Sequence, residues 1–558
     1  MRSCSILRLV LLSVFTAVIS VQAAAQESLI HREGDARRHS TIENARARQN
    51  YFYNRLTWPD GSIPVGARAR AFDQMRVMRQ YAPMRKGGMA LKWKNVGPDN
   101  VGGRIFGMAL NPLRPATMFV GAADGGVWRS YDAGLTWESI SDGFPTQSMG
   151  SIVINPVDTS VVYAATGDAS FGSRSVDGAG VFKSTDGGSS WTEVGEGSLP
   201  EYARASDMAI NPTNPDILYL AVPDGIRDAT QIGIWRSTDA GDSWSLILTG
   251  RMTDIVINPQ NPDVLYTVSS KIFGSSTADR YGVFKTDDGG DNWTKLDIGV
   301  TDSLIGRTAI GICATQPDNV YLGVSEVTGD GRTPLLGVFK TADAGANWTK
   351  LEVPFDYMIS QGWFDNIIGV HPTDPDIVYA GGVKLIRSAD GGQSWERIAD
   401  QLAGGILHVD HHEIEFDPSD PDRVYVGNDG GLFLLTDAGK TLEKRDRGLS
   451  ITQFIGGDMY PGNDAFVFGG TQDNGTLRSF DQPSFDLVLY GDGGHGYIHP
   501  TKPNIMYTTQ ERLKLWRSED FGRTWTWAIG DLPNEGSLFY IAYAMDKTDP
   551  DVLYLGTY

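Results

Sequence analysis

Short apolar runs separated by turn residues recur along most of the chain. One unit contains four such runs, Ser151–Ile154, Val161–Ala165, Gly180–Lys183 and Trp191–Val194. Apolar residues within the runs alternate with polar ones or are continuous, and Gly, Pro, Asn and Asp lie between the runs, as is typical of strands and turns. Few stretches have the periodicity of a long amphipathic helix. The pattern therefore predicts an all-β chain of short strands.

A motif of the form Ser/Thr-x-Asp-x-Gly-x-x-Trp, the Asp box, marks the turn between the third and fourth runs. Successive aspartates are 47 to 55 residues apart, except for a last gap of 83 residues. We expect the aspartate to accept backbone N–H groups, the glycine to supply a positive φ and the tryptophan to pack into the next unit. The boxes are therefore predicted to be structural. Their aspartates are Asp132, Asp186, Asp239, Asp288, Asp343, Asp390, Asp437 (where Leu442 replaces the tryptophan) and Asp520.

Four short strands repeated about every 50 residues predict a β-propeller, in which each repeat forms one blade. Turns of the Asn-Pro type mark about ten four-stranded blades, and the tenth stops at Tyr558 after its second strand. The segment Leu91–Val96 resembles an outermost strand with no blade before it. Either one large ring or a seven-bladed propeller followed by part of a second would fit. We expect residues 91–558 to be a propeller region truncated at its C-terminus.

The N-terminal segments differ from the repeats. Residues 1–25 combine Arg2 and Arg8, an apolar run and a small-residue end at Ala23–Ala25, which predicts a cleaved signal peptide and an extracellular or periplasmic protein. Residues 26–90 are Arg-rich and are predicted to form an extended leader with helical stretches near 41–56 and 67–81. Beyond the signal, no apolar run reaches the roughly 18 residues of a membrane span. Cys313 is the single cysteine outside the signal, which excludes an intramolecular disulfide.

Charge and motifs narrow the classes of function. The net charge of −20 argues against a nucleic-acid partner, because nucleic acids are bound by basic surfaces. The sequence has no Gly-x-Ser-x-Gly elbow, no Walker loop and no His-Glu-x-x-His helix, so the corresponding reaction classes are excluded. No cofactor is predicted.

Blade topology separates two faces of a propeller. Turns joining strands one and two, and the Asp boxes joining strands three and four, share one face. Loops joining strands two and three, and those between blades, share the other face. The second-face loops vary most in length, as Gly381–Val383 and Gly167–Gly180 illustrate. Because variable loops on a rigid scaffold commonly form binding sites, we look for function on this face.

The first blade resembles a known family. The stretch from Gly102-Gly103-Arg104 to Phe119–Ser130 is similar to the opening blade of xyloglucanase-type glycoside hydrolases. The Asp-box blades over 91–558 are equally similar to the sortilin family and to many bacterial repeat proteins, so much of the likeness is repeat consensus shared with non-enzymes.

The xyloglucanase resemblance implies two catalytic aspartates, which fall here on Asp124 and Asp492. Asp124 lies in Ala-Asp-Gly-Gly, without the family's spacer, and Asp492 in Gly-Asp-Gly-Gly, followed by His495 where the family has glycine. Such a pair would protonate the leaving oxygen and activate water, with the carboxyl groups about 6.5–9.5 Å apart in an inverting enzyme. Asp429-Gly-Gly shows that the same pattern also occurs as ordinary turn chemistry.

Aromatic residues provide candidates for ligand binding. The segment 354–366 is the most aromatic non-repeat stretch on the loop face, and Tyr357, Trp363 and Phe364 could stack on a sugar or peptide. The alternative is local packing beneath the loop. His495 joins these residues as a candidate because it lies beside Asp492.

The cluster His408-Val-Asp-His-His is unusual in this chain. If it enters an innermost strand, His408, Asp410 and His412 share one face and form a candidate metal site. Hydrogen bonding around the propeller channel is the alternative.

The leading hypothesis is a secreted, xyloglucanase-like glycoside hydrolase that is endo-acting on β-glucan or xyloglucan through Asp124 and Asp492. The alternative is a non-catalytic, sortilin-like propeller that binds an extracellular polypeptide or a glycan. A purely structural part of a larger surface protein is the third hypothesis. Polysaccharide or extracellular polypeptide is therefore the predicted partner.

Overall fold

The computed structural model describes residues 95–169, 176–200, 202–224, 229–271, 281–328, 332–399, 401–530 and 537–556, together with six positions between Arg70 and Met78. Those six positions are helical and fall within the predicted stretch 67–81. The signal segment 1–25, nearly all of the leader 26–90 and most of the strand expected at 91–96 lie outside the described residues. Within the described ranges, no helix is long and apolar enough to cross a membrane.

The fold is an all-β propeller, as the sequence predicts. Seven four-stranded antiparallel sheets follow one another between residues 105 and 444, each with its strands in sequence order. Their strands are β1–β4 (Ile105–Leu110, Met118–Ala122, Gly126–Ser130, Glu138–Ser139), β5–β8 (Met149–Ile154, Val162–Thr166, Val181–Ser184, Thr192–Val194), β9–β12 (Asp207–Ile210, Leu218–Val222, Gly233–Ser237, Ser245–Thr249), β13–β16 (Met252–Ile257, Leu265–Ser269, Val283–Thr286, Thr294–Leu296), β17–β20 (Ile305–Ile312, Val320–Glu326, Leu335–Thr341, Thr349–Leu351), β21–β24 (Ile367–Val370, Val378–Gly381, Leu385–Ser388, Glu396–Arg397) and β27–β30 (His411–Phe416, Val424–Asn428, Gly431–Thr436, Thr441–Lys444).

Smaller elements connect these sheets. The strands β25 (Gln401–Leu402) and β26 (Gly405–Ile406) pair as a short hairpin before β27. Two single-turn 3₁₀ helices are Ala229–Gln231 and Asp302–Leu304.

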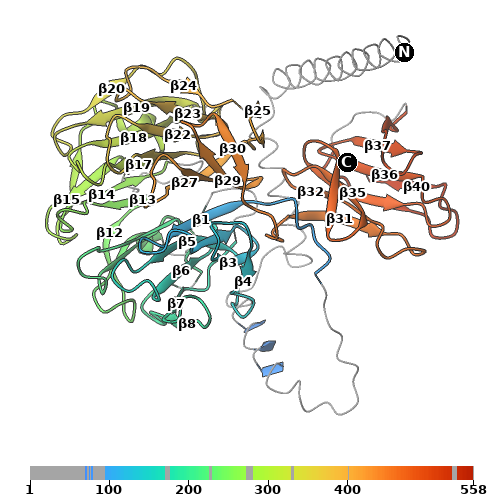
Figure 1. Ribbon diagram of the computed structural model, residues 1–558, viewed down its shortest axis with the longest axis horizontal. Helices are drawn as coiled ribbons and strands as arrows, with labels where there is room; N and C mark the ends of the chain where they lie inside the picture. Colours follow the sequence, from blue (N-terminus) through green and yellow to red (C-terminus); the bar gives the residue numbers. More distant parts are fainter. Residues whose placement is uncertain are drawn as a thin grey trace, which may run out of the picture.

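A second group of sheets follows the first seven. It contains β31–β34 (Phe454–Met459, Val467–Thr471, Thr476–Asp481, Ser484–Leu489), β35–β38 (Gly493–Ile498, Met506–Gln510, Lys514–Ser518, Thr526–Trp527) and the two-stranded β39–β40 (Tyr543–Met545, Leu553–Leu555). Figure 1 shows the two groups side by side, with the seven sheets around a ring and the second group, coloured orange to red, beside it.

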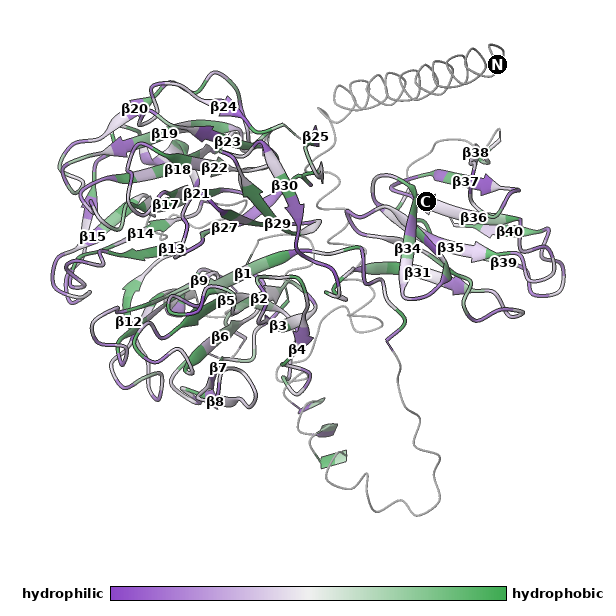
Figure 2. Cartoon of the chain, in the orientation of Figure 1, coloured by the Kyte–Doolittle hydropathy of each residue, from purple (hydrophilic) through white to green (hydrophobic). Residues whose placement is uncertain are grey.

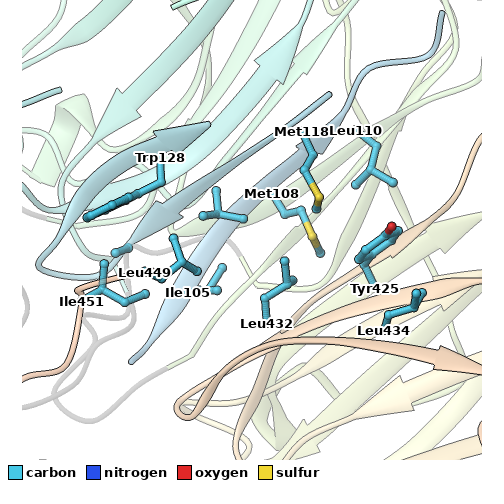
Figure 3. Packing of buried hydrophobic residues seen from close by; sticks show 12 residues of the cluster. Ile105, Met108, Leu110, Met118, Trp128, Tyr425, Leu432, Leu434, Leu449 and Ile451 are labelled. Atoms are coloured by element: carbon cyan, nitrogen blue, oxygen red, sulfur yellow. The ribbon is translucent and has the colours of Figure 1, made fainter. Parts of the chain in front are cut away.

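The seven sheets close on themselves. The first strand of each sheet contacts the first strand of the next, and β1 contacts both β5 and β27. Ile105, Met108 and Trp128 of the first sheet pack with Tyr425 and Leu432 of the seventh in one buried cluster (Figure 3). Of the two arrangements compatible with the sequence, the contacts therefore correspond to a seven-sheet ring followed by a separate group.

Burial explains the character of each strand. The second strand of each blade is covered on both faces by neighbouring sheets, so continuous apolar runs such as Met118–Ala122 and Leu218–Val222 are fully buried. The fourth strand lies at the outer edge and is short and largely exposed, as in Thr294–Leu296. Figure 2 shows a similar contrast within one blade, between the hydrophobic first strand β1 and the hydrophilic fourth strand β4. Short polar outer strands limit edge-to-edge pairing between molecules.

The Asp boxes have the predicted turn geometry. In the box of β19–β20, Asp343 Oδ1 accepts the Asn347 N–H at 2.8 Å and the Thr341 hydroxyl at 2.7 Å. The same bonds recur, with Ser or Thr first, in the boxes of Asp132, Asp186, Asp239, Asp288, Asp390 and Asp520.

The box tryptophan packs in the opposite direction to the one predicted. Trp137 Nε1 donates to the Arg445 carbonyl oxygen at 2.8 Å. Arg445 follows the last strand of the seventh sheet, which lies before the first sheet in the closed ring. The residues around Trp244 likewise come from the preceding blade, where Val194 and Gly195 lie against its box. Each box therefore fastens its own blade to the one before it.

Aspartates on the inner strands make a second type of blade connection. Asp207 Oδ2 on β9 accepts the Ile255 N–H of β13 at 2.9 Å, and Asp254 Oδ2 on β13 accepts the Ile310 N–H of β17 at 3.0 Å. These carboxylates link neighbouring blades at the centre of the ring, opposite the outer edge.

Candidate active site

Asp124 lies in the tight turn between β2 and β3 and is exposed. Its Oδ2 accepts a hydrogen bond from Gln453 Nε2 at 2.7 Å. The glycines that follow Asp124 are required by close packing, because a Cβ on Gly125 would lie 2.6 Å from Ile451. The turn therefore holds Asp124 against the segment that leads from the ring to β31.

Asp492 lies immediately before β35 and is half-buried. Its Oδ1 accepts the Asp473 N–H at 3.0 Å. Asp473 belongs to the turn between β32 and β33. The glycine after Asp492 also serves close packing, since a Cβ on Gly493 would lie 2.5 Å from the Gly475 carbonyl oxygen. Both Asp-Gly-Gly stretches therefore place a carboxylate where two backbone segments meet.

One short stretch of the second group of sheets connects the two aspartates. Gln453, which contacts Asp124, accepts the Gln472 N–H on its carbonyl oxygen at 2.9 Å. The next residue, Asp473, contacts Asp492. The structure thus brings Asp124 and Asp492 to one hydrogen-bonded network, although they are far apart in the sequence and belong to different groups of sheets.

Arg104, directly before β1, anchors this network to the ring. Its Nε and Nη2 donate to the two carboxylate oxygens of Asp429 at 2.6 and 2.7 Å, and Nη2 also donates to Asp473 Oδ2 at 2.6 Å. The guanidinium lies over the Phe364 ring, 5.0 Å from its centroid. Asp429 also contacts His412 Nε2 at 2.7 Å.

The charges of this cluster are strongly stabilised. Burial alone would lower the pKa of Arg104, but the carboxylates of Asp429 and Asp473 outweigh it and raise that pKa well above its usual value. Burial likewise opposes ionisation of Asp429, yet Arg104 and then His412 hold its pKa well below the usual range. Burial lowers the pKa of His412. Asp429, which in the sequence looks like ordinary turn chemistry, is therefore a buried charge paired with Arg104.

The predicted metal site is not formed by the three proposed ligands. Strand β27 begins at His411, so His408 and Asp410 precede it, and Asp410 has a φ of +63°. The alternation that would align the three side chains does not apply. His408 Nε2 lies 3.1 Å from the Asp473 carbonyl oxygen, while His412 contacts Asp429. Among the described residues, no group of three or more His, Cys, Asp or Glu could hold a metal ion.

The aromatic candidates have different environments. Tyr357 and Trp363 are 1 % and 8 % exposed, so they cannot offer a ring face to a sugar, and that part of the prediction is wrong. Tyr357 packs in the core between the fifth and sixth sheets, as in the alternative of local packing. Phe364 is half-buried and lies between Arg104 and His412. His495, on β35, is half-buried with its ring against Gly456 of β31.

Sequence reasoning missed the polar residues that connect the candidate pair. Gln453 and Asp473 carry no motif, and the long gap between the last two Asp boxes only marks a blade without a box there. Arg104 ends the Gly-Gly-Arg stretch that supports the family resemblance, but its partner Asp429 lies 325 positions away. No local pattern indicates such a pairing.

Parts of the chain are similar in sequence to known proteins. The family described as Sortilin-Vps10 (sortilin, neurotensin receptor 3) matches residues 125–251. A xyloglucanase of Paenibacillus sp. is 23% identical over 326 residues, and one of Acetivibrio thermocellus is 31% identical over 166 residues. The chain resembles the xyloglucanases. These matches cover 56% and 28% of this chain, but only 27% and 19% of those two proteins.

Solved structures add a likeness in fold. The crystal structure of a GH74 xyloglucanase from Xanthomonas campestris matches with a TM-score of 0.59 and 18% identity, covering 80% of this chain and 70% of that one. At this identity the match shows the propeller fold.

Proposed function

We propose that this protein is a secreted, xyloglucanase-like glycoside hydrolase with Asp124 and Asp492 as its acid and base. The observation that carries the proposal is the shared network, in which Asp124 contacts Gln453 and Asp492 contacts the neighbouring turn through Asp473. The similarity to curated xyloglucanases favours a β-glucan substrate of the xyloglucan type.

The chemistry requires two carboxyl groups with different protonation. One, protonated, donates its proton to the glycosidic oxygen as the C–O bond breaks, and the other, ionised, takes a proton from the attacking water. The two carboxyl groups have different hydrogen-bond donors, since Asp124 contacts the side-chain amide of Gln453 and Asp492 contacts the backbone N–H of Asp473. Residues 1–25 provide the export signal in this proposal.

Hydrolysis assays on xyloglucan and on undecorated β-glucan test the proposal. Asp124→Asn and Asp492→Asn keep the side-chain shape but remove the acid–base function, so each is expected to lower kcat by about 10²- to 10⁴-fold. Asp288→Asn is the matched control, because Asp288 is an exposed Asp-box residue with turn hydrogen bonds. It should retain activity close to that of the wild type.

Two outcomes would contradict the proposal. The first is an absence of hydrolysis on every glucan, and the second is activity that both substitutions leave unchanged. Binding of a glycan or an extracellular polypeptide without hydrolysis would instead support the sortilin-like alternative, which the match over residues 125–251 favours.

A further inference from the structure

The turn between β32 and β33, residues 472–475, is held by the ring at three points. Arg104 Nη2 contacts Asp473 Oδ2 at 2.6 Å, and His408 Nε2 lies 3.1 Å from the Asp473 carbonyl oxygen. Asn474 Nδ2 donates to the Asp429 carbonyl oxygen at 2.9 Å. All three partners belong to the ring, whereas the turn belongs to the second group of sheets. The turn closes through its own Thr471–Gly475 hydrogen bond, and the ring adds three contacts that fix it from outside its own sheet.

The other side of the same turn faces the candidate catalytic pair. The N–H groups of Gln472 and Asp473 point to the Gln453 carbonyl oxygen and to Asp492 Oδ1, at 2.9 and 3.0 Å. Gln453 in turn donates to Asp124. A displacement of the turn would therefore move the hydrogen-bond donors of both carboxylates at once.

The backbone of Asp473 supports a role for its side chain. Its φ is +62°, a left-handed conformation that glycine adopts without cost and other residues adopt rarely. Its carboxylate is 15 % exposed and the Arg104 side chain 5 %, so their contact is largely shielded from water. A glycine would satisfy the backbone better, but it would leave Arg104 without this partner. The ion pair with Arg104 is a contact that glycine could not make at this position.

We propose that Asp473, fixed by Arg104, is a positioning residue that sets the geometry of the Asp124–Asp492 pair. This inference rests on the proposed function. Asp473 does not act on the substrate: its carboxylate binds Arg104, and its N–H then holds Asp492. Acid–base catalysis requires the catalytic groups to lie close to their reactive positions, and a displacement of about 1 Å can lower the rate about 10²-fold.

The test compares Asp473→Gly with Asp473→Asn in the full chain, using xyloglucan as substrate. The glycine variant removes the carboxylate but suits the left-handed backbone, and it should lower kcat about tenfold to hundredfold with KM within about twofold of wild type. The asparagine variant keeps an acceptor oxygen for Arg104 and tolerates the same φ, so it should recover most of kcat.

A matched control breaks another arginine–aspartate pair in the same group of sheets. Arg478 contacts Asp486 on β34 at 3.0 Å, and Asp486→Ala, which removes that carboxylate, should leave kcat unchanged. A double-mutant comparison then separates positioning from general stability. In an Asp492→Asn background, Asp473→Gly should lower kcat by a smaller factor than in the wild type, because its effect through Asp492 is already lost. A stability defect would lower kcat by the same factor in both backgrounds.

The outcomes distinguish the two proposals. If Asp124→Asn and Asp492→Asn lower kcat as expected while Asp473→Gly has wild-type kcat, the positioning role is overturned and the proposed function stands. A loss in Asp473→Gly that repeats fully in the Asp492→Asn background also overturns it. If the wild type hydrolyses no glucan, the proposed function fails and this inference fails with it.

Discussion

Carboxylates on the Asp-box turns and carboxylates on the inner strands of the ring experience opposite environments. Asp343 is exposed in its box, and hydrogen bonds from the Asn347 side chain and backbone and from Thr341 lower its pKa to about 2. On the inner strands, burial and then the neighbouring Asp254 raise the pKa of Asp207 well above its usual value, and burial raises that of Glu415 to about 7. The repeated turns favour ionised aspartate, while the inner strands oppose charge.

The junction cluster combines features of both regions. Asp429 is as buried as an inner-strand carboxylate, yet Arg104 keeps it ionised. Repetition explains the boxes, because the same few bonds form in every blade. The Arg104 pair is buried more deeply than the similarly placed pair of Arg251 and Asp224 before β13, whose side chains are 20% and 30% exposed. It also occurs where the ring meets the second group of sheets. The Asp boxes therefore stabilise the blades that contain them, whereas the Arg104 cluster stabilises the junction between the ring and the second group of sheets.

The largest expected effect comes from breaking the buried pair. Arg104→Met leaves Asp429 charged and buried beside His412, so the free energy of unfolding should fall by about 3–5 kcal/mol. Urea unfolding at pH 7 measures this loss. Arg387→Met is the control, because its partner Glu396 is 55% exposed and such pairs contribute about 1 kcal/mol or less. Equal losses in the two variants would contradict the distinction between junction and surface pairs.

Features whose contacting residues are close in sequence could be predicted, and features whose contacting residues are far apart could not. Box bonds link residues two to four positions apart, such as Ser388, Asp390 and Ser394, so a motif reveals them. The predicted packing direction of Trp137 is wrong because its partner, Arg445, lies 308 positions away in the sequence. Asp124 and Asp492 are predicted from family resemblance, whereas the polar network between them depends on how two groups of sheets meet.

The predictions for Tyr357, Trp363 and the histidine metal site were wrong for a related reason. A run of aromatic residues looks the same whether the rings face solvent or the core, and Tyr357 is buried between two sheets. Period-two alternation applies within a strand, but β27 begins at His411, after the turn at Asp410. The first error depends on the sheets that pack against Tyr357, and the second on the residue at which β27 begins. The local sequence pattern contains neither.

A smaller effect should come from neutralising an inner-strand carboxylate. The pKa of Glu415 is raised from 4.5 to about 7 by burial, so the folded state loses stability as the pH rises from about 4.5 to about 7. Glu415→Gln should therefore be more stable than wild type at pH 8, by on the order of 1 to 3 kcal/mol, and unchanged at pH 4. Urea unfolding at both pH values measures this difference. Glu396→Gln, at an exposed position, is the control at both pH values. A stability difference for Glu415→Gln that did not change between pH 4 and pH 8 would contradict the burial effect.

The smallest effect is expected in a single Asp box. The pKa of Asp343 falls from 3.8 to about 2 in the folded state, so its contribution to stability is present above about pH 4 and is lost as the pH falls toward 2. Asp343→Asn should lower the melting temperature slightly at pH 6, because the group is exposed and its bonds compete with water, and the difference from wild type should vanish near pH 2. Asp464→Asn, at an exposed aspartate outside any box, should not change the melting temperature at either pH. If the Asp343→Asn difference persisted undiminished at pH 2, the ionised carboxylate would not be what the turn stabilises, and the electrostatic contrast between box and inner strand would fail.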